Sequence, residues 1–388
     1  MSPLAGEPFD LILHSAHKVD ADGECADFWF AARGGRIVET GQGAGWRGKP
    51  ASLVVDAHGD RLTPGFIDVH GHGGSGHAFD EEAGGIEAAL AVHRAHGTTR
   101  SVLSLVASPL PETKAALSRI ASLARHDPLI LGSHLEGPYL APARKGAHDP
   151  ANLRTPSLAE AEDLFDAGGG TVRQITIAPE LPHALEVIGR AHERGIVAAV
   201  GHTAADHAQA LAGFDAGARL LTHTFNAMNG IHHRAPGPIV AALSRPGVTL
   251  ELILDGVHVH PDVARLLFAG APGRVTLITD AMAATGVGDG EYRLGSLDVT
   301  VKGGKAVLKG TDSIAGSTLT QDRALRLAIE RVGLEPRAAV EALTLTPARV
   351  LGRADEFGRL APGYAADAVL FDGAWSVRSV WAAGERIA

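Results

Sequence analysis

The residues best suited to chemistry are histidines and carboxylates that follow predicted strands. Two of them, His70 and His72, follow the apolar run 66–69, and their spacing places both imidazoles on one face of an extended segment. Two imidazoles that converge in this way can hold one metal ion, and the glycines around them let the backbone approach closely. The sequence therefore predicts a metal site at the end of this strand.

The same loop also matches the glycine pattern of a dinucleotide-binding turn, through Gly71, Gly73 and Gly76. That fold would need a helix opening directly at the loop and an acidic residue about 20 positions further on. The predicted helix begins near residue 85, which is too late, and His72 would occupy the phosphate turn. We therefore reject nucleotide binding at this loop.

Four more predicted strands end in residues of the same chemical kinds. These residues are Glu136, His202, His223 and Asp280, at or after the strands 129–133, 197–200, 220–223 and 274–278. One histidine at a strand end is usually structural, but five such ends in one ring are improbable by chance. Nitrogen and carboxylate ligands without a thiolate suit zinc or another divalent metal.

A divalent metal lowers the pKa of bound water to about 7 and polarises a substrate carbonyl. A carboxylate beside that water can take its proton and pass it to a leaving amine, and Asp280 stands alone on its strand for this role. The alternative for Asp280 is a structural carboxylate that caps the following loop. A serine or cysteine nucleophile is not supported, because no G-x-S-x-G motif occurs and Cys25 lies in a β-rich segment.

The middle of the chain alternates predicted strands and helices. The strands are 65–69, 100–106, 129–133, 173–177, 197–200, 220–223, 249–254 and 274–278, and the helices between them include 86–96, 111–124, 158–167, 183–193 and 206–213. Eight strands separated by helices predict an α/β fold of the TIM (β/α)8 barrel type, whose active site lies at the carboxyl ends of the strands. A doubly wound sheet would need fewer strands and a nucleotide-binding loop.

Both ends of the chain are rich in predicted strands. These are 9–13, 27–31 and 36–38 at the start and 366–371 and 377–381 at the end. We expect them to pair into a small β-sandwich domain made of residues 1–61 and 359–388, with the barrel over 62–358. A hairpin over 292–309 either caps the barrel or joins the small domain, and helices 320–332 and 336–343 return the chain to its β-rich end.

The amino-acid composition argues against several classes of binding partner. The 388 residues carry a formal net charge of −9, which argues against nucleic acid or an anionic membrane. No apolar run approaches the roughly 18 residues of a membrane span, and residues 1–7 lack the features of a signal peptide. The single cysteine excludes an internal disulfide and fits a reducing cytoplasm. The 20 histidines are many for this length and clustered, as metal chemistry would require.

Several longer motifs extend the pattern over nearly the whole chain. They are P-G-F-I-D-V-H at 64–70, H-L-E-G-P at 134–138, G-H-T at 201–203, H-T-F-N-A-M at 223–228, D-G-V-H at 255–258, T-D-A at 279–281, A-G-S-T-L-T at 315–320, T-P-A-R at 346–349 and G-R-L-A-P-G at 358–363. The chain resembles the amidohydrolase superfamily and, within it, the N-acetylglucosamine-6-phosphate deacetylase family. The H-L-E-G-P and H-T-F-N-A-M motifs are specific to the deacetylases, whereas the opening H-x-H is shared across the superfamily.

The resemblance implies a metal centre and an acid–base residue. It implies that one divalent metal, zinc by preference, is held by Glu136, His202 and His223. Asp280 would act first as general base and then as general acid. Because His70 and His72 are both present, a second and weaker metal fits, about 3.5–4 Å from the first.

Substrate contacts are implied in the same way. Asn226 and Ala227 match a segment whose backbone N–H groups contact phosphate. Arg234 matches a basic residue that reaches the phosphate of the neighbouring site across a homodimer, and a guanidinium suits bidentate phosphate contact. His258 matches a residue near the acetyl carbonyl, and His148 one near the sugar hydroxyls. Each of the last three would otherwise be an ordinary polar loop residue.

The implied reaction is hydrolysis of N-acetyl-D-glucosamine 6-phosphate to D-glucosamine 6-phosphate and acetate. The galacto epimer is an alternative substrate, since loop residues would distinguish one hydroxyl. A dihydroorotase-like cyclic amidase or an N-acyl-D-amino acid deacylase is a second alternative, but many of those carry a lysine on the fourth strand and residues 172–180 contain none. A non-catalytic scaffold would lack ligands or the base, and all six positions are occupied.

Overall fold

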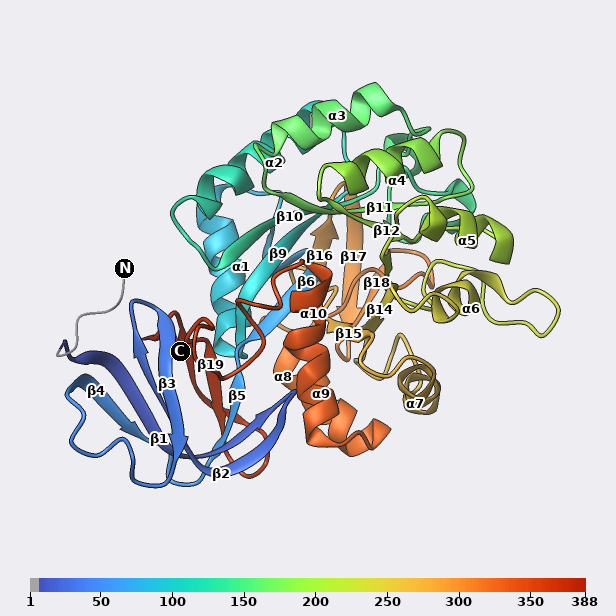
Figure 1. Ribbon diagram of the computed structural model, residues 1–388. Helices are drawn as coiled ribbons and strands as arrows, with labels where there is room; N and C mark the ends of the chain where they lie inside the picture. The colour runs from blue at the N-terminus through green and yellow to red at the C-terminus, as the bar shows by residue number, and fades with distance from the viewer. Residues whose placement is uncertain (1–6) are drawn as a thin grey trace.

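The computed structural model describes residues 7–388, and the prediction about a signal peptide falls on positions that lie outside this range apart from Glu7. Figure 1 shows a barrel surrounded by helices, with a β-rich domain beside it that contains strands from the start of the chain, in blue, and from its end, in red. This arrangement confirms the predicted fold class.

The barrel is an 8-stranded parallel sheet with the order β15-β14-β13-β12-β11-β10-β9-β6. Its strands are β6 Phe66–Gly71, β9 Thr98–Val106, β10 Ile130–Glu136, β11 Val172–Ile177, β12 Val197–Val200, β13 Leu220–Leu221, β14 Thr249–Ile253 and β15 Val275–Ile278. The first and last strands approach each other where the backbone N–H of Asp280 donates to the carbonyl of His70 at 2.8 Å. Below that bond, the Thr279 hydroxyl donates to the Asp68 carboxylate at 2.6 Å. These contacts join the two edges of the sheet at the end where the candidate site residues lie.

Helices surround the barrel and cover the outward side chains of its strands. They are α1 Ala83–Ala95, α2 Leu110–Ala124, α3 Leu158–Ala167, α4 Ala184–Glu193, α5 His207–Asp215, α6 Gly237–Leu243, α7 Pro261–Gly270, α8 Gln321–Leu327, α9 Pro336–Leu343 and α10 Leu345–Val350. In α4 the buried residues Ala184, Val187, Ile188 and Ala191 recur every three or four positions, as an amphipathic helix requires. Within residues 7–388, no helix combines the length and the apolar character needed to cross a bilayer.

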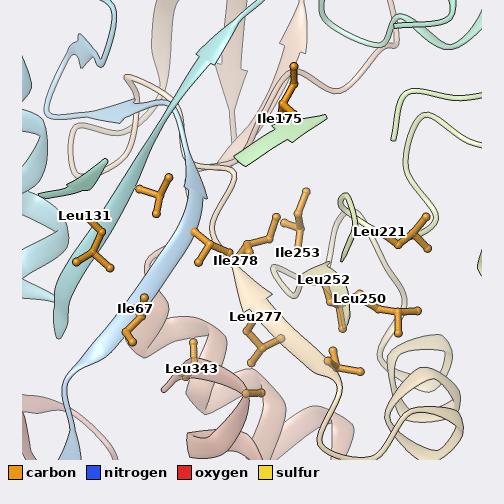
Figure 2. Packing of buried hydrophobic residues seen from close by; sticks show 14 of the residues in the cluster. Ile67, Leu131, Ile175, Leu221, Leu250, Leu252, Ile253, Leu277, Ile278 and Leu343 are labelled. Atoms are coloured by element: carbon orange, nitrogen blue, oxygen red, sulfur yellow. The ribbon is translucent and has the colours of Figure 1, made fainter. Parts of the chain in front are cut away.

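The apolar side chains of the strands form one continuous core with those of the helices. Figure 2 shows Ile67, Leu277 and Ile278 on their strands, with Leu343 on the neighbouring helix α9. All four are at most 1% exposed. Because this core fixes the strands tightly, the strand ends are rigid supports for functional side chains.

The β-rich domain is a second 8-stranded sheet built from both ends of the chain. Its strands are β1 Phe9–Asp20, β2 Gly23–Arg33, β3 Arg36–Gln42, β4 Ala51–Asp56, β5 Arg61–Pro64, β19 Ala368–Phe371, β20 Val377–Ala382 and β21 Glu385–Arg386. Strand β5 pairs with β19, and this pairing joins the two ends of the chain. The side chains of Phe30, Leu62 and Trp381 lie in the separate core of this domain.

The hairpin after the last barrel strand belongs to the barrel. Strands β16 Gly290–Leu294, β17 Leu297–Lys302 and β18 Lys305–Leu308 form their own antiparallel sheet. Leu294 and Val299 pack in one cluster with Met282, which follows β15, and with Val106 at the end of β9. The hairpin therefore lies against the carboxyl ends of the barrel strands, which answers the question that the sequence left open.

Candidate active site

The predicted site residues converge at the carboxyl end of the barrel. Glu136 is the last residue of β10, and His202, His223 and Asp280 each lie two positions beyond the last residue of their strand. These three have positive φ angles of 45°, 24° and 48°, a backbone conformation that costs a non-glycine residue about 1–3 kcal/mol. Such strain persists only where surrounding structure holds it, and it turns these side chains toward one centre.

One carboxylate oxygen lies between three imidazoles. Glu136 Oε1 is 3.1 Å from the Nε2 atoms of both His202 and His223, and 3.3 Å from His70 Nε2. All four side chains are at most 5% exposed. This cluster brings the predicted first-metal ligands together with one of the predicted second-metal ligands.

The other oxygen of the same carboxylate lies close to two further imidazoles. Glu136 Oε2 is 3.2 Å from His72 Nε2 and 3.3 Å from His148 Nε2. Asp280 Oδ1 is 3.3 Å from His72 Nε2 and 3.7 Å from His70 Nε2. Glu136 therefore lies between two sets of ligand atoms and can bridge two cations.

The hydrogen-bond partner of the His202 ring determines which of its nitrogens carries the proton. His202 Nδ1 donates to the carbonyl of Arg144 at 2.9 Å, so the Nε2 of a neutral ring carries a lone pair. Burial, the largest effect, lowers the pKa of His202 to about 4, which keeps the ring neutral at pH 7. Its lone pair faces a carboxylate oxygen of Glu136, and two such acceptors repel unless a cation lies between them. The donor set thus fits a metal ion.

His72 lies between two carboxylates that favour a positive charge, which a proton on the ring supplies when no metal ion is bound. Burial opposes its charged form, but hydrogen bonds to Asp280 and Glu136 outweigh burial and raise the pKa of His72 to about 9. A proton on this ring supplies the positive charge that the two carboxylates require. Within residues 7–388, two groups have the geometry to hold a metal ion, namely His70 with His72 and Asp280, and Glu136 with His148 and His202.

His148 differs from the other imidazoles in its hydrogen bonds. Its Nδ1 accepts the backbone N–H of Ala107 at 3.2 Å, so a neutral ring carries its proton on Nε2. That Nε2–H points at Glu136 Oε2 at 3.3 Å and can donate to it. This arrangement favours His148 as a hydrogen-bond donor at the site over a metal ligand.

A cavity of about 270 Å³ opens above these groups. Its lining includes His72, Glu136, His148, His202, His223, Asn226, Ala227, His258 and Asp280, together with Leu294 from the hairpin and Ser313 and Ile314 from the loop after it. His258 Nδ1 donates to Asp255 at 2.7 Å, which leaves its Nε2 for the cavity. The backbone N–H of Asn226 donates to the carbonyl of His223 at 2.9 Å, so it is occupied within its own turn.

Of the predicted site residues, His70 is buried among the ligand groups and does not line this cavity, and Arg234 lies away from it altogether. It is exposed, and its guanidinium donates to the neighbouring His233 ring at 2.8 Å. The rings of His232 and His233 lie 4.2 Å apart between centroids and are tilted by 41°, and the resemblance accounts for neither residue. In the part of the chain that the structure describes, no lysine or arginine lines the cavity.

Comparison with known proteins assigns the family. The model of the amidohydrolase family matches residues 61–387, which include the whole barrel. The chain belongs to the amidohydrolase family. Among curated amidohydrolase relatives, N-acetylgalactosamine-6-phosphate deacetylase of Escherichia coli O157:H7 is 39% identical and covers 86% of this chain and 89% of its own. N-acetylglucosamine-6-phosphate deacetylase of Bos taurus is 36% identical over 93% of this chain and 91% of its own.

A solved structure agrees with these sequence relatives. A mutant N-acetyl-D-glucosamine-6-phosphate deacetylase of Mycobacterium smegmatis, in complex with N-acetyl-D-glucosamine 6-phosphate, aligns with a TM-score of 0.92 at 41% identity. The alignment covers 98% of this chain and all of that one. The two chains therefore share their architecture, including the β-rich domain, over the aligned residues.

Sequence reasoning missed two buried polar residues beneath the centre. Glu251 on β14 and Gln174 on β11 are both 0% exposed, and Gln174 Nε2 donates to Glu251 Oε1 at 2.9 Å. Glu251 interrupts the apolar run T-L-E-L-I-L, and a lone carboxylate inside a buried strand was a signal that could have identified it. Its partners could not be inferred from the run itself.

Proposed function

We propose that this amidohydrolase is a metal-dependent deacetylase that hydrolyses N-acetyl-D-glucosamine 6-phosphate to D-glucosamine 6-phosphate and acetate. The observation that carries this proposal is the convergence of two carboxylates and five imidazoles on one cavity, in a chain with two relatives, at 36% and 41% identity, that bear this activity in their names.

We assign the tighter metal position to Glu136, His202 and His223, and a weaker one to His70, His72 and Asp280. Zinc is the metal we favour, because nitrogen and carboxylate oxygen are the available ligands and the only cysteine lies in the β-rich domain. When bound, such a metal supplies Lewis acidity toward a carbonyl and lowers the pKa of a water molecule to about 7. We place the protein in the cytoplasm, where a single cysteine stays reduced.

Asp280 is the proton carrier in this proposal. It lines the cavity and lies 3.3 Å from His72, at the border between the ligand cluster and the space for substrate. Its carboxylate takes the proton of the attacking water and then delivers it to the amide nitrogen as the C–N bond breaks. With this proton the nitrogen leaves as a neutral amine, and the acetic acid formed from the added hydroxyl ionises, so acetate and the free amino sugar are the products.

The remaining contacts orient the sugar. We assign His258 to the acetyl carbonyl of the substrate and His148 to the sugar hydroxyls, since both residues line the cavity. For the phosphate we assign the backbone N–H of Ala227, because that of Asn226 is already bonded within the turn. The side chain of Asn226 lines the cavity beside it.

The phosphate also needs a cation, and we propose that a second copy of the chain supplies it. Arg234 stands on an exposed loop, outside the cavity of its own chain. In a homodimer with the loop of one protomer over the cavity of the other, its guanidinium would make a bidentate contact with the phosphate. A site without such a cation would hold a dianionic ligand poorly in a protein of net charge −9.

A deacetylase for N-acetyl-D-galactosamine 6-phosphate is the second candidate, favoured by the 39% identity to the Escherichia coli relative. Acylated amino acids are less suited, since β11 Val172–Ile177 carries no lysine that could bridge two metals. The two sugars differ in the orientation of one hydroxyl, which loop residues around the cavity would contact.

The deciding experiment measures acetate release by zinc-loaded protein from three substrates. They are N-acetyl-D-glucosamine 6-phosphate, its galacto epimer and unphosphorylated N-acetyl-D-glucosamine. We expect the largest kcat/KM for the first and a loss of several orders of magnitude without phosphate. Preference for the epimer would establish the second candidate, and activity on none of the three would refute both.

A further inference from the structure

A buried carboxylate that the proposed mechanism does not use lies directly beneath the metal centre. Glu251 is 0% exposed and does not line the cavity, so it can touch neither substrate nor bulk water. Its neighbours on the strand, Leu250 and Leu252, point to the opposite face, which directs Glu251 to the interior of the barrel. A charge in such a place is strongly destabilising unless hydrogen bonds compensate for the lost water.

The bonds of Glu251 link both ligand groups through a single atom. Its Oε2 accepts Nδ1–H of His70 at 3.0 Å and also the backbone N–H of His223 at 3.1 Å. Its other oxygen accepts the Gln174 amide at 2.9 Å, and its backbone carbonyl accepts the N–H of Thr224 at 2.8 Å. Every one of these donors belongs to another strand or to a strand end.

The first bond determines which nitrogen of His70 is available. Because Nδ1 carries the proton toward Glu251, Nε2 of the neutral ring carries a lone pair. That Nε2 lies 3.3 Å from His72 Nε2 and 3.3 Å from Glu136 Oε1. A carboxylate behind a metal-bound histidine fixes the tautomer and raises the basicity of the ligand nitrogen.

The second bond holds the backbone of His223 in its strained form. The φ of this residue is 24°, and strand β13 ends at Leu221, earlier than the sequence predicts. From there the chain turns so that the N–H of His223 and that of Thr224 both point to Glu251. The carboxylate thus ties the direction of one ligand to the tautomer of another.

We propose that Glu251 is a positioning residue that makes a second metal position available between His70, His72 and Asp280. This inference rests on the proposed metal centre and adds a residue that acts through His70 and His223 without contacting the substrate. Without Glu251, the Nδ1 and Nε2 tautomers of His70 compete, and only one of them presents a lone pair to the metal.

Two variants separate the charge of Glu251 from its hydrogen bonds. In Glu251→Gln the amide oxygen can still accept from His70 and His223, while its NH2 faces Gln174. A flip of the Gln174 amide would then present its Oε1, which has no hydrogen-bond partner among the described residues. Glu251→Ala removes both the charge and the bonds. Asp20→Asn is the matched control, since Asp20 is also 0% exposed but lies in the β-rich domain.

The test is zinc titration of metal-free protein, with bound zinc counted by mass spectrometry, and 15N NMR of labelled histidine rings. We expect wild type and Asp20→Asn to bind two equivalents. The second equivalent should bind about 10–100-fold more weakly in Glu251→Ala and be weakened less in Glu251→Gln. The zinc-loaded NMR spectrum of wild type should show a His70 ring protonated at Nδ1 and metal-bound at Nε2, and Glu251→Ala should lose this signature.

The outcomes separate this inference from the proposed function. Unchanged affinity for the second equivalent and an unchanged His70 signature in both variants would overturn the inference while wild-type deacetylation stands. A wild type that binds one equivalent would also overturn it, because no second position would exist. A wild type that binds no zinc would overturn the proposed function and this inference together.

Discussion

The Nε2 atoms of His202 and His223 lie 2.9 Å apart, and each is 3.1 Å from the same oxygen of Glu136. With His202 neutral, its lone pair faces that oxygen, and the close approach is stabilised either by a proton on His223 Nε2 or by a cation bound among the three groups. The geometry of the barrel therefore favours a cation among these three side chains.

Metal removal is expected to lower thermal stability as well as activity. A ligand that binds only the folded state stabilises it by about 4 kcal/mol when its free concentration is a thousandfold above Kd. Dialysis against a chelator should abolish deacetylation and lower Tm by several degrees, and added zinc should restore both. The measurement is differential scanning calorimetry with parallel assays; an unchanged Tm with full activity in chelator would contradict the metal centre.

Asp280→Asn tests the proton carrier without changing the shape of the side chain. An amide cannot accept the proton of the attacking water, so kcat should fall by about 10²–10⁴-fold. The circular dichroism spectrum and the tightly bound zinc equivalent should stay as in wild type, because the ligands Glu136, His202 and His223 remain, whereas the weaker position loses one of its ligands. Near-normal turnover would show that another group carries the proton.

Asp322 lies outside the active site, and we expect it to make the free energy of unfolding depend on pH. Burial would raise the pKa of Asp322, but hydrogen bonds from His96 and Thr320 and the charge of Arg326 outweigh burial and hold it at about 2. The unfolded value is about 3.9, so the stabilisation is complete above pH 4 and is lost as pH falls through about 2. Asp322→Asn should lower the free energy of unfolding by about 2 kcal/mol at pH 7.

The check is urea denaturation of both metal-free proteins from pH 7 down to the lowest pH at which they fold. The difference should shrink on acidification, because a protonated Asp322 resembles asparagine. Asp355→Asn is the control, since Asp355 is exposed, and it should change the free energy by less than about 0.5 kcal/mol throughout. A difference that stays constant with pH would refute the assigned pKa.

The sequence was sufficient for the barrel because strand periodicity and the strand-end histidines are local signals. The helices 158–167 and 336–343 were predicted with the bounds that the structure has. The hairpin could not be placed, since its position depends on packing of Leu294 and Val299 against Met282, far from any local pattern. Proton positions on His70, His148 and His202 depend on partners that only the folded chain brings near.

Arg234 offers a test of whether one protomer completes the site of another. Arg234→Ala should raise KM for the phosphorylated sugar far more than for the unphosphorylated one, because only the phosphorylated sugar has a phosphate that the guanidinium can contact. Equal effects on both substrates would remove Arg234 from the phosphate site. This variant keeps Asp280, whereas Asp280→Asn keeps Arg234, so the two chains carry complementary defects.

Mixing these two variants, with dissociation and reassociation of the protomers, should therefore restore activity. In a mixed dimer, the site with intact Asp280 receives Arg234 from the other chain, so about a quarter of all sites become complete after random exchange. The control is a mixture of Arg234→Ala dimers and wild-type dimers without exchange of protomers. Its activity should equal the sum of the activities of the two separate proteins. If exchange of the two variants restores nothing although mixed dimers are detected by native mass spectrometry, Arg234 acts within its own chain or not at all.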